Sequence, residues 1–90
     1  MLDTQVSILL VDDHAVVRAG YRHLLETQGG FSKVLEAENA QDAYAVCQKE
    51  LPDLVICDIS MPEPVGLSLV QRILGRWPEA KILMFTMHNS

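Results

Sequence analysis

Short apolar runs that alternate with amphipathic stretches constrain the fold of this chain more than any other feature. The first run, Ile8–Val11, is apolar at four successive positions, and Leu54–Cys57 repeats this character in mid-chain. Runs of this kind are typical of strands that are buried on both faces of a parallel sheet. An amphipathic stretch follows each run, so the pattern predicts βα units wound around one parallel sheet.

The alternation predicts four strands and three helices in the order βαβαβαβ. The expected strands are Ser7–Val11, Lys33–Ala37, Leu54–Cys57 and Lys81–Thr86. The second of these is mixed in character, as is typical of a strand at the edge of a sheet. The first helix is expected to end at Gly29-Gly30, because glycine accepts the backbone conformations found just past a helix end. Asn39 is expected to cap the second helix.

Each predicted helix carries apolar residues at helical spacing on one face. The expected core positions are Val17, Tyr21, Leu24 and Leu25 in the first helix, Ala40, Ala43, Tyr44, Cys47 and Leu51 in the second, and Leu67, Val70, Ile73, Leu74 and Trp77 in the third. Arg18 and Arg22 of the first helix are expected to point away from the core. Arg72 and Arg76 of the third helix are interpreted as a solvated pair.

Composition limits the size and the partners of the chain. Ninety residues, 49% of them hydrophobic, suffice for one small domain. Twelve acidic against seven basic residues give a net charge of −5, which argues against binding of a nucleic-acid backbone by this segment. The sequence shows no secretory signal, no apolar run that could span a membrane and no metal-ligand spacing of its two cysteines. A cytoplasmic protein is therefore expected.

Acidic residues stand where the predicted strands end. Asp12 and Asp13 follow the first strand, Asp58 ends the third, and Thr86 brings a hydroxyl to the end of the fourth. The carboxyl ends of parallel strands share one edge of a sheet, and ligands bind there. Carboxylates crowded at such an edge repel one another unless a cation binds between them or their pKa values rise. Oxygen ligands favour a hard cation, and Mg²⁺ fits best.

Each acidic feature alone has a simpler explanation. An Asp-Asp pair after a strand is often a helix cap with a first-turn acid, and Asp58 alone could cap a loop. Together, in register on the βα pattern, they favour a cation site. The neighbouring His14 is interpreted as a partly exposed residue at the helix start, and Cys57 as a small buried hydrophobic residue.

Three segments, Ile8–His14, Asp53–Pro62 and Lys81–Thr86, resemble the receiver domain of two-component response regulators. Within the second segment, Met61-Pro62 follows Asp58 at the spacing typical of that family. Further runs, Val17–Gly20 with Leu24-Leu25 and Thr86-Met87-His88, look most like the NarL/FixJ (LuxR-type) transcriptional regulators. The resemblance implies a flavodoxin-like, doubly wound parallel sheet with strand order 2-1-3-4.

The resemblance also implies a role for each residue of the site. Asp58 would accept a phosphoryl group from the phosphohistidine of a sensor histidine kinase, and Thr86 would be the switch hydroxyl. Asp13, Asp58 and the backbone carbonyl of Ser60 would bind Mg²⁺ directly, and Asp12 would bind it through a water molecule. The chain would then be a switch that regulates transcription, rather than an enzyme with turnover.

The resemblance covers residues 1–90 as the N-terminal portion of a receiver domain. The family's fifth strand, with its basic site residue, and a DNA-binding output domain are expected beyond Ser90. Without them the fourth strand would be an open edge, and apolar surface beside the first helix would be uncovered. We therefore expect self-association or exchange of elements between copies, and contact with DNA only through the further domain.

Two other functions compete with that of a phosphorylated receiver. A degenerate receiver that takes no phosphate and serves as a binding or dimerisation module is the alternative. A Mg²⁺-dependent phosphohydrolase is disfavoured, because such enzymes usually carry an Asp-x-Asp pattern after the first strand, and the adjacent Asp12-Asp13 pair lacks that spacing.

Overall fold

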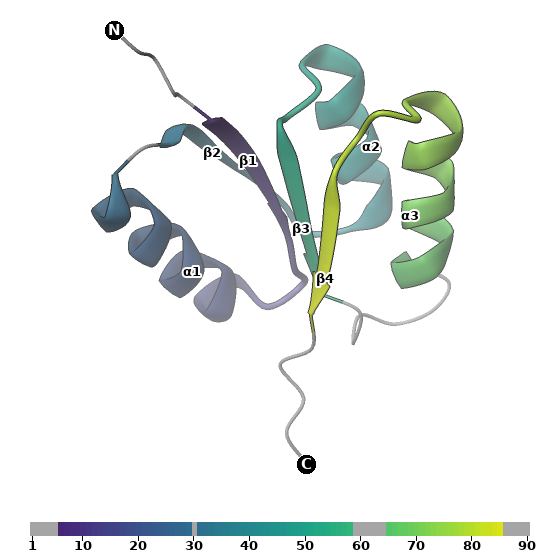
Figure 1. Ribbon diagram of the computed structural model, residues 1–90. Coiled ribbons are helices and arrows are strands. Elements are labelled where there is room, and N and C mark those ends of the chain that lie inside the picture. Colours follow the sequence, from purple (N-terminus) through teal and green to yellow (C-terminus); the bar gives the residue numbers. More distant parts are fainter. Residues whose placement is uncertain (1–5, 30, 59–64, 86–90) are drawn as a thin grey trace, which may run out of the picture.

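Strands and helices alternate along the whole described part of the chain (Figure 1). The computed structural model describes residues 6–29, 31–58 and 65–85. Within these ranges the elements are β1 (Val6–Val11), α1 (Ala15–Gln28), β2 (Phe31–Ala37), α2 (Ala40–Lys49), β3 (Leu54–Asp58), α3 (Val65–Arg76) and β4 (Ile82–Phe85). The predicted order is confirmed. None of the described helices is long and apolar enough to cross a membrane.

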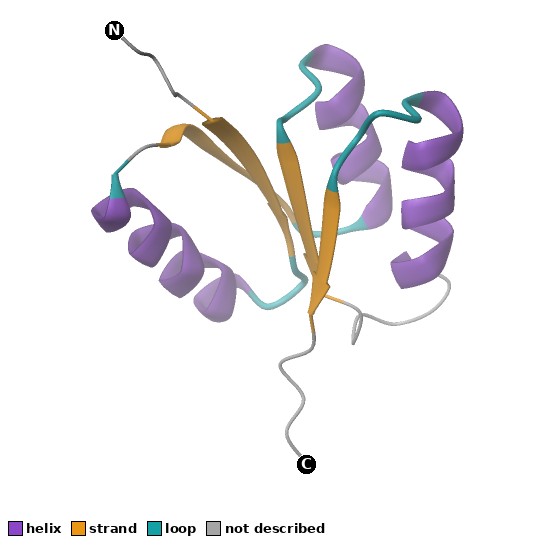
Figure 2. Cartoon of the chain, viewed as in Figure 1, coloured by secondary structure: helices purple, strands orange, loops and turns teal. Residues whose placement is uncertain are grey.

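The strands form one parallel sheet in the order β2-β1-β3-β4, as predicted. β1 pairs with β2 on one side and with β3 on the other, so it lies inside the sheet. Its apolar run Ile8–Val11 is buried throughout because helices cover both faces there. Figure 2 shows α1 on one face of the sheet and α2 with α3 on the opposite face. This arrangement is a doubly wound sheet, and it leaves β2 and β4 as the two edges.

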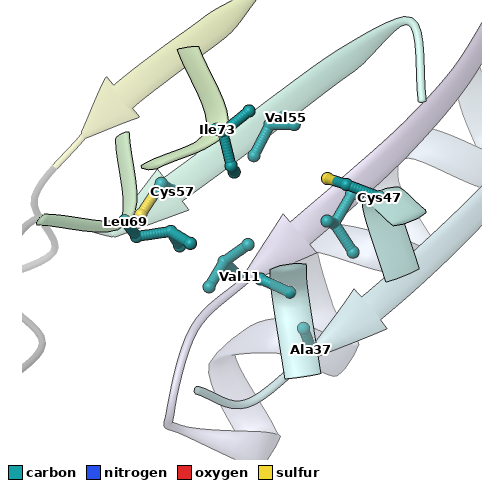
Figure 3. Close-up of a cluster of buried hydrophobic side chains, with 9 residues drawn as sticks. Val11, Ala37, Cys47, Val55, Cys57, Leu69 and Ile73 are labelled. Atoms are coloured by element: carbon teal, nitrogen blue, oxygen red, sulfur yellow. The ribbon is translucent and has the colours of Figure 1, made fainter. Parts of the chain in front are cut away.

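Two apolar clusters fill the spaces between the sheet and its helices. On the face covered by α2 and α3, buried side chains alternate along the strands and meet the helices (Figure 3). This cluster consists of Leu9, Val11, Ala37, Ala43, Cys47, Val55, Cys57, Leu69 and Ile73. The opposite cluster is smaller: Ile8, Leu10 and Val34 are buried, with partly buried residues packed against them, Tyr21 and Leu25 of α1 among them.

The predicted core positions of α2 are confirmed, and those of α3 are partly wrong. Ala43 and Cys47 of α2 are buried, and the side chain of Asn39 caps this helix by accepting a 2.7 Å hydrogen bond from the backbone N–H of Asp42. In α3 the fully buried residues include Leu69, which the sequence analysis omitted, whereas Leu74 is 39% exposed. Leu69 and Ile73 are four residues apart and share one stripe, and Leu74 lies one position further round the helix.

α1 is attached to the sheet differently from the other helices. No residue of α1 is fully buried, and Leu24, a predicted core residue, is 55% exposed. Arg18 and Arg22 were expected to point away from the core; both guanidinium groups bind the carboxylate of Glu36 on β2, a contact that the helical pattern does not predict. As predicted, α1 ends at a glycine, since Gly29 has a φ of 79°, a value that other residues rarely adopt.

An apolar groove lies between α1 and the β4 edge of the sheet. It has a volume of about 400 Å³ and is lined by Leu10, Tyr21, Leu24, Leu25, Gln28, Ile56 and Leu83. Leu83 of β4 is 53% exposed. The predicted open edge and uncovered apolar surface are thus present in the described structure, while self-association stays a prediction.

Candidate functional site

The carboxyl ends of β1 and β3 bring three aspartates together. Asp58 is the last residue of β3, and Asp12 follows β1 directly; the two strands are in register, with Val11 paired to Cys57. One side-chain ligand atom from each of Asp12, Asp13, His14 and Asp58 lies within 4.8 Å of the others. The structure therefore gathers the aspartates that the sequence analysis singled out, and their individual roles stay predictions.

Two of these carboxylates are withdrawn from water. Asp58 is 0% exposed and Asp12 is 2% exposed, whereas Asp13 is exposed. One oxygen of Asp12, Oδ1, accepts a 2.8 Å hydrogen bond from the backbone N–H of His14. The other, Oδ2, is buried without a hydrogen-bond partner among the described residues. A buried, unsatisfied carboxylate oxygen is costly, and a bound cation would remove that cost.

His14 adds an imidazole at the open side of the acidic cluster. Its side chain is exposed at the N-cap position of α1, as the sequence analysis predicted. Its Nδ1 lies 3.0 Å from Oδ1 of Asp13 and 3.3 Å from Oδ1 of Asp12, contacts that the sequence analysis did not foresee. Its position directly after the Asp12-Asp13 pair was the available signal.

Cys57 is part of the core and lies next to the site. Burial first, and then the negative charges of Asp58 and Asp12, together raise the pKa of its thiol to about 11. The thiol therefore remains protonated near neutral pH, and a protonated thiol is a poor nucleophile. This agrees with the interpretation of Cys57 as a small buried hydrophobic residue.

The backbone of Asp12 is fixed through both of its polar groups. Its N–H donates a 3.1 Å hydrogen bond to the carbonyl oxygen of Ala37, at the end of β2. Its carbonyl oxygen accepts a 2.6 Å hydrogen bond from Nη1 of Arg18. Arg18 was not predicted as a site residue, although its place in the first turn of α1, six residues after Asp12, is visible in the sequence.

The remaining predicted site residues, Ser60 and Thr86, lie outside the described residues, as do Met61-Pro62. The structure does show that Phe85, the last residue of β4, pairs with Asp58. The carboxyl end of β4 thus reaches the same edge of the sheet as the aspartates.

Comparison with known proteins decides the family. Residues 8–90 match the model of the response regulator receiver domain. The chain belongs to this family. The match supports a part in phosphorylation-controlled signalling by a two-component system.

The receiver domain is similar to LuxR-type response regulators, as its sequence motifs predicted. It is 41% identical over 84 residues to the response regulator UvrY of Escherichia coli (strain K12), covering 93% of this chain and 38% of UvrY. A solved LuxR-family response regulator from Aurantimonas sp. SI85-9A1 is 41% identical, with a TM-score of 0.86 over 96% of this chain and 61% of that one. RcsB from Salmonella enterica serovar Typhimurium, solved bound to a promoter in the presence of the phosphomimetic BeF3-, is 28% identical, with a TM-score of 0.81 over 94% of this chain and 43% of RcsB. The receiver domain thus spans about two fifths of the length of UvrY.

Proposed function

We propose that this receiver domain is a phosphorylation-controlled switch in which Asp58 is the phosphoacceptor. The observation that carries the proposal is the fully buried carboxylate of Asp58 at the end of β3, within 4.8 Å of ligand atoms of Asp12 and Asp13. Asp58 lies at the carboxyl edge of the sheet, where open α/β folds bind their ligands. Three carboxylates at one such edge fit a reaction that depends on positioning and charge.

In the proposed reaction, a carboxylate oxygen of Asp58 attacks the phosphorus of a phosphohistidine on a sensor histidine kinase. An O–P bond forms as the P–N bond breaks, and the kinase histidine leaves as a neutral imidazole after it takes up a proton. The product on Asp58 is an acyl phosphate. A protein that undergoes this step as its own substrate is a switch and not an enzyme with turnover.

Mg²⁺ fits the donor atoms that the site offers. Asp13, Asp58 and the backbone carbonyl of Ser60 would hold the ion directly, and Asp12 would hold it through water. The buried Oδ2 of Asp12 supports this assignment because it has no hydrogen-bond partner among the described residues. Bound Mg²⁺ supplies positive charge that offsets the charge of the phosphoryl oxygens during transfer.

Phosphorylation of Asp58 is proposed to change the contacts of Thr86, the residue that follows β4 in the sequence. Phosphorylation adds about −1.5 to −2 charges to Asp58, together with strong acceptor oxygens. Thr86, which follows β4 in the sequence, is proposed to donate its hydroxyl to them. We further propose that the chain acts in the cytoplasm and regulates transcription through a DNA-binding domain outside it; the promoter-bound relative RcsB supports this reading.

Labelling with a small phosphodonor tests the assignment of Asp58. The chain is incubated with Mg²⁺ and acetyl phosphate, from which phosphoryl transfer releases acetate, and the intact mass is measured. We expect a gain of one phosphoryl group that disappears in Asp58→Asn. The control Glu79→Gln removes an exposed carboxylate at the amino ends of the strands, opposite the aspartates, and should keep the gain.

Two results would contradict the proposal. A gain that persists in Asp58→Asn would place the phosphoryl group on another residue. A full-length protein that binds Mg²⁺ but gains no mass would favour the alternative function, a receiver that serves as a binding module without phosphate.

A further inference from the structure

Arg18 connects the acidic site to β2, the edge strand that pairs with β1. Its side chain is only 14% exposed, although it belongs to a helix without a fully buried residue. Its guanidinium group contacts two partners at once. Nε donates a 2.7 Å hydrogen bond to Oε1 of Glu36, and Nη1 donates one of 2.6 Å to the carbonyl oxygen of Asp12.

Glu36 holds the guanidinium group of Arg18 in place. Its second oxygen, Oε2, accepts a 2.6 Å hydrogen bond from Nη1 of Arg22, so the carboxylate lies between two arginines. The hydrogen bond from Arg18 and, to a smaller extent, the one from Arg22 lower the pKa of Glu36. The ionised carboxylate fixes the plane of the Arg18 fork, and a planar fork has little freedom once one arm is bound.

The hydrogen bond to Asp12 acts on the peptide group that joins Asp12 to Asp13. The peptide unit is planar, so a donor on the Asp12 carbonyl oxygen fixes the orientation of the whole unit. The N–H of Asp12 is already fixed by Ala37. Together the two contacts set the directions in which the Asp12 and Asp13 side chains leave the backbone.

We propose that Arg18 is a positioning residue of the acidic site, which holds the Asp12–Asp13 peptide in the orientation that cation binding requires. This inference rests on the proposed function, because it takes the acidic cluster to be a Mg²⁺ site. The side chain of Arg18 contacts Glu36 and the carbonyl oxygen of Asp12. It acts through the backbone of Asp12.

The sign of the effect separates positioning from simple electrostatics. A guanidinium group carries a positive charge that repels a nearby cation, so the loss of this charge alone would tighten Mg²⁺ binding. Loss of a group that orients a metal ligand weakens metal binding instead, by about 10–100-fold in known sites. Weaker binding after removal of a positive charge therefore has no Coulombic explanation.

The test is a titration of the chain with Mg²⁺ alone, followed by amide chemical shifts in NMR spectra, on the wild type, Arg18→Gln and Arg22→Gln. Arg22 is the matched control: it binds the same carboxylate of Glu36 from the same helix, and its recorded contacts are with Glu36 and Glu26. We expect Arg18→Gln to weaken Mg²⁺ binding about tenfold, and Arg22→Gln to leave it unchanged. Melting temperatures without Mg²⁺ should fall in both variants, because both lose a contact between α1 and β2.

Each outcome has a distinct meaning. Mg²⁺ binding by Arg18→Gln that equals or exceeds wild-type binding would overturn this inference while leaving the proposed function intact. A wild-type chain without Mg²⁺-dependent shifts would overturn the cation site itself. Should Arg18→Gln fail to fold, Arg18→Lys keeps the charge but removes the fork that bridges Asp12 and Glu36, and unchanged affinity in that variant would equally overturn the inference.

Discussion

Asp12 and Asp58 are the buried charged side chains of the described chain, and they lie at the ends of neighbouring strands. Burial of one carboxylate is unfavourable, and burial of two beside each other adds repulsion. Such an arrangement lowers stability unless a cation binds. The site therefore trades stability of the metal-free chain for affinity toward a cation.

The variant Asp12→Asn tests this trade. The amide keeps the shape of the side chain and can still accept the hydrogen bond from the N–H of His14, but it removes one of the crowded charges. We expect the metal-free variant to be more stable than the wild type by about 1 kcal/mol, the order of one buried unsatisfied polar group. Mg²⁺ should raise its melting temperature less than that of the wild type.

Thermal melts with and without Mg²⁺ measure both effects, with Glu79→Gln as the control for loss of an exposed acidic charge. A metal-free Asp12→Asn that is less stable than the wild type would contradict the argument. It would mean that the Asp12 carboxylate is stabilised within the fold by more than its two contacts with His14.

At the scale of elements, α1 differs from α2 and α3 in how it is held. α2 and α3 contribute the buried residues Ala43, Cys47, Leu69 and Ile73 to the larger cluster. α1 contributes partly buried Tyr21 and Leu25, and charged contacts between its arginines and Glu36. Part of the attachment of α1 is therefore ionic and should depend on pH.

The variant Glu36→Gln should detach this ionic contact. We expect a loss of about 1 kcal/mol of stability at neutral pH, because two charge-assisted hydrogen bonds at a partly exposed site are weakened. In the folded chain, the hydrogen bonds from Arg18 and Arg22 lower the pKa of Glu36 below its ordinary value of 4.5. The contribution of Glu36 to stability is therefore complete above pH 4.5 and is lost as the pH falls through the lowered pKa. The wild type should thus lose more stability than Glu36→Gln on acidification below 4.5.

Urea unfolding between pH 3 and pH 7 measures this difference. Glu50→Gln is the matched control, because it breaks a carboxylate contact with Lys33 in which both side chains are about half exposed. Such exposed pairs contribute about 0.2–1 kcal/mol. Equal losses in Glu36→Gln and Glu50→Gln at every pH would show that the contact with the arginines of α1 has no special weight.

At the scale of the whole molecule, one edge of the sheet is apolar and has no further strand paired with it among the described residues. β4 lies at this edge, and Leu83 faces the groove beside α1. Unpaired strand edges with exposed apolar side chains promote association between chains. We predict that two copies of the chain associate through β4 and this groove.

Sedimentation over a range of concentrations measures the association. We expect the wild type to self-associate and Leu83→Lys to shift the equilibrium toward monomers, since a charge in the groove would be buried at the contact. Leu74→Lys is the control, because Leu74 is also an exposed leucine but belongs to α3, on the opposite face of the sheet. A wild type that stays monomeric at high concentration would contradict the prediction.

The sequence allowed the order of elements and the gathering of the aspartates to be predicted, because both depend on local patterns. Apolar runs mark buried strands, and each strand end fixes where the next residue lies. The packing of individual helix residues was harder to predict, as the errors at Leu69 and Leu74 show. Helical periodicity leaves a helix free to rotate by one position until its partner is known.

The contact between Arg18 and Glu36 was beyond reach for a related reason. Arginine on an amphipathic helix is usually solvated, and the residue that binds it lies eighteen positions further along, on another element. Only the assembled sheet brings them together. Ser60 and Thr86 lie outside the described residues, so their predicted roles depend on the family resemblance alone.

The absence of fully buried residues from α1 has a consequence for motion within the domain. A helix without a fully buried residue can open while the rest of the sheet stays folded, and its amides then exchange with solvent faster than those of a well-seated helix. Each such opening of α1 would withdraw the Arg18 fork from the Asp12 carbonyl. Ligand binding at the aspartates and protection of the α1 amides from hydrogen exchange would then be coupled. A ligand bound at the carboxyl ends of the strands would slow hydrogen exchange along a helix that it does not contact.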